Sequence, residues 1–425
     1  MSIKLSNFGK IKNAEIKVDG LTVIAGKNDT GKSTIGKSLY AVIKSITAYP
    51  EMYEQLKNLD IIFVLLPTIF NCFRSFTGNT QDEEYKKLSN IRNQLVSKFP
   101  NNNERFLKSY SECYTEIPYY LSILEEFINK YNLDDEIKNT LQLMRDMHTL
   151  SLDDNAKFKK ICDEILIKIF KSNINNSVTL EKSILEYDIG LQNIAKIIID
   201  NETVEQTFFS AELRTNSFRD ATLIDSPLYL EEEHEARHNF VIDLKEKITK
   251  ARQDFNTSTT NRDMLKKIEE ILNGATFVVD DENKQLGYMP RNAKKALPIS
   301  NIASGAKSFG LIYLLLKSGI LVEDSLLILD EPENHLHPEW QIKYAEMLIS
   351  LINGGFNVLL TSHSPTFIHA LTTFARKYKV DEKKVNFYLA EKIDNENYSN
   401  INNMNHDIEK IFDNLCSPND VLYLW

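Results

Sequence analysis

Gly26-Lys27-Asn28-Asp29-Thr30-Gly31-Lys32-Ser33 has the spacing of a phosphate-binding loop, in which a glycine and four further residues precede Gly-Lys-Ser. A glycine-rich turn lets backbone N–H groups approach phosphate oxygens closely. The lysine adds a positive charge at the β- and γ-phosphates, and the hydroxyl ligates Mg²⁺. The stretch therefore predicts a site for a nucleotide and magnesium.

The residues on either side of this loop have the pattern that phosphate binding requires. Apolar residues 21–25 predict a buried strand, and the run that starts at Ser33 predicts a helix. A strand, a loop and a helix N-terminus in this order form an anion-binding site. We expect the following residues to bind the nucleotide: Gly26, Asn28, Asp29, Thr30, Gly31, Lys32, Ser33 and Thr34.

A second stretch with functional residues runs from Ser325 to Glu333. An apolar strand ends there in two carboxylates, Asp330 and Glu331. In an open α/β sheet, ligands bind at the carboxyl ends of the strands. We expect Asp330 to hold Mg²⁺ through water and Glu331 to orient and deprotonate the attacking water, because phosphoryl transfer needs mainly positioning and charge compensation.

Two further stretches lie at the ends of predicted elements. Small residues at 302–308 precede an apolar helix, and small residues at a helix N-terminus form another anion site. After an apolar strand at 356–360, the sequence Thr361-Ser362-His363-Ser364-Pro365 places His363 at a strand end. Its place in the chain is the one expected of a residue that senses the γ-phosphate.

The composition limits the class of protein. A chain of 425 residues can hold about two or three domains, and its net charge of −10 argues against a broadly basic nucleic-acid surface. Its four cysteines lie far apart, which suggests neither a disulfide framework nor a zinc ribbon and fits a reducing cytoplasm. The N-terminus lacks the apolar core of a signal peptide, and the longest apolar run, residues 61–70, is too short to span a bilayer. We expect a cytoplasmic protein with no membrane partner.

The residue pattern along the chain predicts an α/β core with a large helical insertion. Three short strands come first, and between Lys37 and Ile189 the only glycine is Gly78. Apolar residues recur at helical spacing in this part of the chain. Strand character returns around residues 207–228, and residues 274–290 read as a hairpin. The remainder alternates helix and strand, as an α/β core does.

One motif indicates a metal site that we reject. The stretch His234-Glu235-Ala236-Arg237-His238 matches the spacing of a zinc-protease helix. Three glutamates precede it, Arg237 lies inside it and no downstream ligand is evident. A buried metal helix would be more apolar. We interpret the stretch as a solvated helix.

Together the motifs resemble ATP-binding-cassette (ABC) ATPases outside the transporter branch, a group that includes RecF, the chromosome-structuring SMC proteins and the OLD-family ATPases. The resemblance rests on Phe8-Gly9-Lys10-Ile11, on residues 20–26 and on the stretch from Asp330 to Pro338. The last stretch is especially similar to the AAA family ATPases of prokaryotic defence systems, such as the PtuA-like ATPases of Septu systems. The resemblance covers residues 1–45 and 270–425.

The resemblance implies an α/β fold with an ABC-ATPase head, a mixed sheet flanked by helices, and the residue pattern adds a large all-helical insertion that the resemblance does not cover. The divisions that we expect are residues 1–45 for the N-terminal lobe with the phosphate-binding loop, 46–204 for the helical insertion, 205–230 for a return to the head, 231–272 for a helical segment and 273–425 for the C-terminal lobe.

The resemblance also implies a head-to-head dimer, or a higher oligomer, with ATP and Mg²⁺ between the subunits. Ser304 and Gly305 would contact the γ-phosphate of the nucleotide that the partner binds. The residues that would act on the nucleotide of their own subunit are Lys32, Ser33, Asp330, Glu331 and His363.

The sequence departs from the transporter-type signature around Ser304. Ala303, Ala306 and Lys307 replace Leu, Gly and Gln. The glutamine that senses Mg²⁺ in the family has no obvious equivalent either. Gln206 is one candidate, and Asn216 is the alternative.

The leading hypothesis for function is an ATPase that controls a separate effector, a nuclease or toxin, in bacterial anti-phage defence. The chain after His363 is too short for the TOPRIM nuclease domain of OLD-type proteins, so the effector would be another protein. The apolar residues 61–70 predict a helical interface for it. A RecF- or SMC-like DNA-repair ATPase is the second hypothesis and keeps DNA open as a partner. A scaffold that binds ATP to assemble, with little turnover, is the third.

Overall fold

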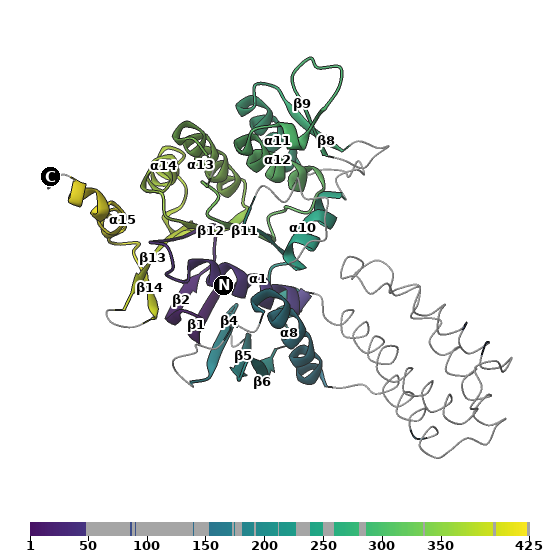
Figure 1. The fold of residues 1–425 in the computed structure, drawn as a ribbon, viewed down its shortest axis with the longest axis vertical. Helices are drawn as coiled ribbons and strands as arrows, with labels where there is room; N and C mark the ends of the chain where they lie inside the picture. Colours follow the sequence, from purple (N-terminus) through teal and green to yellow (C-terminus); the bar gives the residue numbers. More distant parts are fainter. Residues whose placement is uncertain are drawn as a thin grey trace. The chain divides into compact units, whose positions relative to one another are not determined.

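A computed structural model describes most of the chain outside the region between residues 48 and 152 (Figure 1). The described residues are 1–47, 86, 90, 139, 153–171, 174, 181–190, 193–210, 212–226, 239–249, 259–279, 286–334, 336–393 and 397–422, the last six without side chains. Two features named above lie outside these residues: the apolar run 61–70 and the motif at residues 234–238.

One large mixed sheet organises the described part of the chain. Its strands are bonded in the order β6-β5-β4-β1-β2-β14-β13-β3-β12-β11-β7. The strands are, in chain order, β1 (Ser2–Phe8), β2 (Ile11–Lys17), β3 (Leu21–Gly26), β4 (Ser183–Asp188), β5 (Ile194–Asp200), β6 (Thr203–Phe209), β7 (Asp220–Ile224), β11 (Ser325–Asp330), β12 (Asn357–Ser362), β13 (Val385–Lys392) and β14 (Ser399–Asn403).

Helices flank this sheet, as the sequence predicts for an α/β fold, so the predicted class is confirmed (Figure 1). Pro338 and Pro365 begin their helices at positions where the missing N–H costs nothing. The helices are α1 (Lys32–Thr47), α8 (Asp154–Phe170), α9 (Leu213–Asn216), α10 (Asn239–Thr249), α11 (Thr259–Ile271), α12 (Ser304–Lys317), α13 (Pro338–Asn353), α14 (Pro365–Lys377) and α15 (Glu409–Leu422), with short 3₁₀ turns η5 (Ile299–Asn301) and η6 (Glu382–Lys384).

The strand that leads into the phosphate-binding loop lies in the middle of the parallel part of the sheet. β3 is parallel to β12 on one side and to β13 on the other, and β11 and β7 continue the parallel order beyond β12. Every residue of β3 is buried. Such continuous burial is expected of a strand with helices on both faces of its sheet.

Alternate residues of the central strands face different helices. Leu327 and Val358 belong to the core that α12, α13 and α14 cover. Their neighbours Ile328 and Leu359 face α1 instead, because a Cβ atom added to Gly36 would lie 2.9 Å from Ile328 Cγ2 and 3.9 Å from Leu359 Cδ2. Gly36 thus lets α1 approach the sheet closely, and α1 begins directly at the phosphate-binding loop.

The other end of the sheet is antiparallel and corrects one prediction. β4 pairs with β1, β5 with β4, and β6 with β5. All of β4 and β5 lies inside residues 46–204, which we predicted to be helical throughout. That boundary is wrong, and the chain divides into compact units at Ala48–Ile161 and at Met1–Thr47 with Cys162–Trp425.

A small second sheet confirms the predicted hairpin. It contains β8 (Thr276–Val279), β9 (Leu286–Met289) and β10 (Leu297–Pro298), bonded in the order β10-β9-β8. The buried ring of Phe277 lies directly against α12, since a Cβ atom at Gly310 would come within 2.5 Å of it.

A largely buried ring of ion pairs joins α1, β7 and α10. Lys44 Nζ lies 2.6 Å from Asp220 Oδ1 and 2.9 Å from Asp243 Oδ1. Lys247 Nζ lies 2.7 Å from Asp220 Oδ2 and 2.8 Å from Asp243 Oδ2. Burial raises the pKa of Asp220, but the ammonium groups of Lys247 and Lys44 outweigh burial and lower it overall. We call these four residues the buried ion-pair ring.

Among the described residues, no helix is long and apolar enough to cross a bilayer.

Candidate active site

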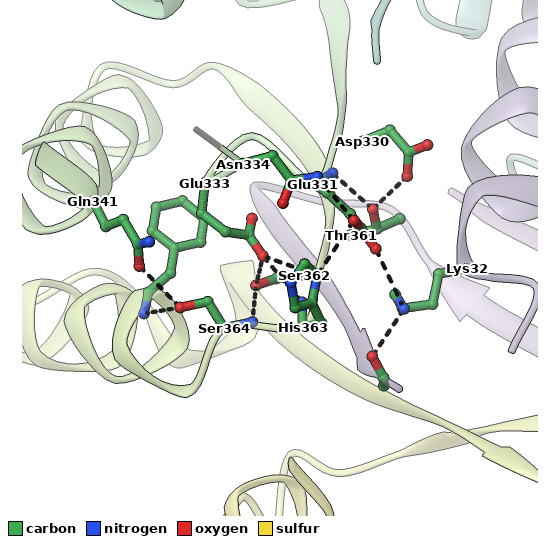
Figure 2. A network of polar contacts seen from close by, with 12 residues as sticks. Lys32, Asp330, Glu331, Glu333, Asn334, Gln341, Thr361, Ser362, His363 and Ser364 are labelled. Carbon is green, nitrogen blue, oxygen red and sulfur yellow. Dashed lines mark hydrogen bonds and ion pairs between the residues drawn. The ribbon is translucent and has the colours of Figure 1, made fainter. Parts of the chain in front are cut away.

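Three loops with predicted functional residues meet at one edge of the large sheet. Because β3, β12 and β11 are parallel neighbours, their carboxyl ends lie at the same edge. β3 leads into the phosphate-binding loop, β11 ends at Asp330, and β12 ends at Ser362 directly before His363. Ligands of open α/β sheets bind at this edge. Figure 2 shows how the side chains converge there.

Two glycines shape the backbone of the phosphate-binding loop. Gly26 has φ of 154°, and a Cβ atom there would lie 2.8 Å from the carbonyl oxygen of Ala390. Gly31 has φ of 81°, and a Cβ atom there would lie 3.1 Å from Ile11 Cγ1. Only glycine adopts such conformations at little cost and leaves room for a close ligand. The loop therefore fits a phosphate chain.

The remaining predicted residues of the loop have different surroundings. Asn28 and Asp29 are exposed, and the hydrogen bonds from Lys10 and Lys392 lower the pKa of Asp29. Thr30 is buried and its hydroxyl donates to the carbonyl of Lys27, so this side chain supports the loop from inside. Thr34 lies in the first turn of α1, half-buried.

Lys32 lies beneath the loop and contacts the predicted general base. Its side chain is 3% exposed, and Nζ donates to the carbonyls of Gly26 at 2.8 Å and Lys27 at 2.7 Å. The same atom lies 3.5 Å from Oε1 of Glu331. Burial lowers the pKa of Lys32, and the nearby carboxylate of Glu331 opposes that effect without cancelling it.

The two predicted magnesium ligands are in contact. Ser33 Oγ donates to Asp330 Oδ1 at 2.9 Å, and Thr361 Oγ1 donates to the same oxygen at 2.5 Å. A hydroxyl and a single carboxylate, completed by phosphate oxygens and water, are the oxygen donors that Mg²⁺ takes at nucleotide sites. Across the described ranges, no three His, Cys, Asp or Glu residues come together as a metal cluster.

Glu331 occupies a strained position at the end of β11. Its φ is 49°, a conformation that is uncommon for residues other than glycine. Its backbone N–H donates to the hydroxyl of Thr361 at 3.0 Å, and its Oε2 accepts from Asn334 Nδ2 at 3.0 Å. Burial raises the pKa of Glu331, but Asn334, His363 and Lys32 outweigh it and lower the pKa overall. The carboxylate is therefore ionised at neutral pH.

His363 approaches the same carboxylate from the neighbouring strand. Its Nδ1 lies 3.2 Å from Glu331 Oε2, and its side chain is 37% exposed. The structure thus brings together five predicted residues: Lys32, Ser33, Asp330, Glu331 and His363. Figure 2 labels all of them except Ser33.

Ser304 and Gly305 form the first turn of α12. Gly305 packs against Leu336 and Trp340, since a Cβ atom there would lie 3.3 Å from the first and 3.4 Å from the second. The predicted signature is therefore in contact with residues that follow Glu331.

The structure does not bring Gln206 to this edge. Gln206 is exposed on β6, the edge strand at the other end of the sheet, and β5, β4, β1, β2, β14 and β13 lie between β6 and β3. Asn216, the alternative, is exposed at the end of α9. Neither residue contributes to the predicted magnesium site.

The sequence analysis missed Asp225. β7 is the parallel neighbour of β11, so Asp225, directly after β7, reaches the same edge as Asp330. A cavity of about 60 Å³ lies between them, and its polar lining includes Asp225, Ser226, Ser308, Asp330 and Glu331. The apolar strand that ends in Asp225 was evident in the sequence, but its pairing with β11 was not.

Fold and site together define an ABC-type P-loop ATPase, with the phosphate-binding loop, the carboxylates and the histidine on neighbouring parallel strands. The chain belongs to the AAA ATPase domain family, whose model matches residues 1–368. No curated protein matches the chain.

Among solved structures, the chain is similar to heads of SMC proteins. For the SMC head domain from Thermotoga maritima, the identity is 10%, the TM-score is 0.39, and the match covers 94% of this chain and 97% of that one. For an SMC head bound to the C-terminal winged-helix domain of ScpA, the identity is 9% and the TM-score is 0.40. That match covers 96% of this chain and 98% of the other. A third match is an SMC head with an extended coiled coil, bound to the C-terminal domain of ScpA derived from Pyrococcus furiosus. Its identity is 7%, its TM-score is 0.42, and the match covers 98% of this chain and 98% of the other.

Proposed function

We propose that this protein hydrolyses ATP to ADP and phosphate. The observation that carries the proposal is the position of Glu331, whose carboxylate lies 3.5 Å from Lys32 Nζ and 3.2 Å from His363 Nδ1. Hydrolysis of a nucleoside triphosphate requires a base for water next to groups that contact the γ-phosphate. Glu331 is placed to act as such a base, and its lowered pKa means that the carboxylate is in the deprotonated form that a base requires.

Each residue of the site would have a separate task. Lys32 would exchange its contacts with the loop carbonyls for the β- and γ-phosphate oxygens. Glu331 would orient the attacking water and take its proton, while His363 would contact the γ-phosphate. Ser33 and Asp330 would hold Mg²⁺, which supplies charge compensation to the phosphates.

We propose further that two chains close head to head on ATP. Ser304 and Gly305 of one chain would then contact the γ-phosphate that the other chain holds. The support is the resemblance of the signature together with its place at the start of α12, because the positive end of a helix dipole favours an anion.

ATP turnover would control a separate effector, a nuclease or toxin, in anti-phage defence. Support comes from the likeness of residues 330–338 to defence ATPases. On this proposal, the purified chain does not cut DNA or RNA by itself.

An ATPase assay on the purified chain, with and without DNA, tests the proposal. Turnover that needs magnesium, disappears in Lys32→Ala and is indifferent to DNA supports an effector-controlling ATPase. Turnover that rises strongly with DNA instead favours a DNA-repair ATPase. ATP-dependent association without turnover would overturn hydrolysis and leave the assembly scaffold.

A further inference from the structure

Glu333 is a buried carboxyl group to which the hydrolysis scheme above gives no task. It follows Glu331 by two positions and belongs to the turn after β11. Only 3% of the residue is exposed. Its side chain points across to the turn after β12, where His363 lies (Figure 2).

One oxygen of Glu333 holds the backbone on which His363 lies. Oε1 accepts a hydrogen bond from Ser362 Oγ at 2.6 Å and another from the backbone N–H of His363 at 3.0 Å. The same oxygen lies 3.8 Å from Nδ1 of the His363 ring. Glu333 therefore binds both the side chain of Ser362 and the backbone N–H of His363, and it holds the backbone from which the His363 ring extends.

The turn after β12 is held from its other side as well. Ser362 Oγ accepts from the backbone N–H of Ser364 at 3.1 Å. Ser364 Oγ accepts from the N–H of Phe367, which caps α14, and donates to Gln341 Oε1 at 2.9 Å. With both sides fixed, the direction of the His363 ring follows from the position of the Glu333 carboxyl.

The second oxygen of Glu333 has a different environment. Oε2 is buried and accepts no hydrogen bond from any described residue. Burial raises the pKa of Glu333, although Ser362 and the backbone of His363 oppose the effect. The titratable groups around it are Glu331 on its own turn, His363 after β12 and, farther away, Lys32 on α1. A buried oxygen without a partner costs stability, so a purely structural position would not favour this residue.

We propose that Glu333 is a positioning residue for ATP hydrolysis, whose buried carboxyl orients His363 against Glu331. The inference rests on the proposed hydrolysis, since it assigns Glu333 a task in that reaction. In the proposed scheme His363 makes one of several contacts with the nucleotide, so Glu333 acts on the rate of reaction more strongly than on the affinity for nucleotide. A displacement of a reacting group by about 1 Å costs about 10²-fold in rate.

Two variants of Glu333 separate the hydrogen bond from the packing. Glu333→Gln keeps an oxygen for Ser362 and His363, whereas Glu333→Leu keeps a similar volume without an acceptor. Glu339→Leu is the control, because Glu339 is an exposed carboxylate in the first turn of α13. For each protein, we would measure kcat, the dissociation constant of a fluorescent ATP analogue, and hydrogen–deuterium exchange of the backbone around residue 363.

We expect Glu333→Leu to lower kcat by about 10- to 100-fold and to change the dissociation constant much less. The N–H of His363 should exchange faster in this variant, while exchange in β3 and α1 stays as in the wild type. Glu333→Gln should restore kcat and protection, and Glu339→Leu should match the wild type throughout.

Several results would overturn the inference. A kcat of Glu333→Leu equal to that of the wild type would overturn it. Faster hydrogen exchange over the whole sheet in this variant would also overturn it, because that result indicates a purely structural role. Failure of Glu333→Gln to restore activity would exclude the acceptor oxygen as the cause. If the wild-type protein itself did not hydrolyse ATP, the proposed function would fail first, and the role of Glu333 in it would fall for that separate reason.

Discussion

Lys32 Nζ lies 3.5 Å from Glu331 Oε1, so the predicted phosphate-binding cation and the predicted general base form an ion pair across the site. Glu331 offsets part of the cost of burying the Lys32 ammonium. In the proposed mechanism the γ-phosphate needs that same ammonium, so nucleotide binding would compete with the ion pair. Binding of ATP would then also release the carboxylate proposed to deprotonate water.

The first prediction separates binding from chemistry at this pair. Lys32→Ala should abolish ATP binding, because it removes the charge at the β- and γ-phosphates. Glu331→Gln should bind ATP and lose about 10²-fold or more in turnover, as expected for a missing base. Equilibrium binding and single-turnover hydrolysis measure the two effects. Unchanged hydrolysis in Glu331→Gln would exclude Glu331 as the base.

The second prediction concerns the proposed dimer. Ser304→Arg should block ATP-dependent dimerisation and leave ATP binding to a single chain nearly intact, because the bulky cation meets the partner's nucleotide. Sedimentation with and without ATP, combined with a binding titration, reports both.

Mixing two inactive variants tests the same model. A heterodimer of Ser304→Arg and Lys32→Ala chains contains one site with an intact Lys32 and an intact Ser304. We expect some turnover from the mixture and almost none from either variant alone. A mixture as inactive as its components would contradict a site shared between chains.

The third prediction concerns the buried ion-pair ring. Lys247→Met leaves Asp220 and Asp243 with Lys44 as their remaining cation in the ring. Removing one member of a buried pair costs about 3–5 kcal/mol of unfolding free energy. Urea denaturation measures the loss. The control is Lys343→Met, which removes an exposed pair with Glu339 and should cost at most about 1 kcal/mol.

The fourth prediction gives the pH dependence of that ring. The pKa of Asp220 is lower in the folded chain than in the unfolded chain, where an aspartate titrates near about 3.9. The unfolded chain therefore takes up this proton first, so the stabilisation is complete above about pH 4 and is lost as the pH falls through the folded pKa. The stability difference between wild type and Asp220→Asn, measured by urea denaturation, should shrink from pH 6 to pH 3.

The residues of the candidate site could be predicted from the sequence because each belongs to a short motif at the end of an apolar strand. The loop before Lys32, the pair Asp330 and Glu331, and His363 all follow such strands. Parallel strands have their carboxyl ends at one edge, so convergence follows from the order of elements. The order of the elements is therefore enough to predict that Lys32 and Glu331 lie near each other.

The antiparallel end of the sheet was missed for a local reason. β4 and β5 are short and follow a long helical region, yet their buried residues alternate strictly, as in Ser183, Leu185 and Tyr187. That period of two was the available signal. Gln206 was misplaced because no local pattern states which neighbour a strand pairs with. Asp225 was missed for the same reason, since β7 and β11 are about a hundred residues apart.

The position of β3 in the sheet determines when, during synthesis of the chain, the phosphate-binding loop can fold. Both neighbours of β3, namely β12 and β13, are synthesised more than three hundred residues after it. Until they leave the ribosome, the loop before Lys32 has no sheet to hold it in shape. Pairing over such separations is slow, and its partly folded forms expose apolar strands that aggregate. A nascent chain of this protein would therefore gain affinity for ATP only after β12 and β13 have been synthesised, and a truncated chain without β13 would not acquire it at all.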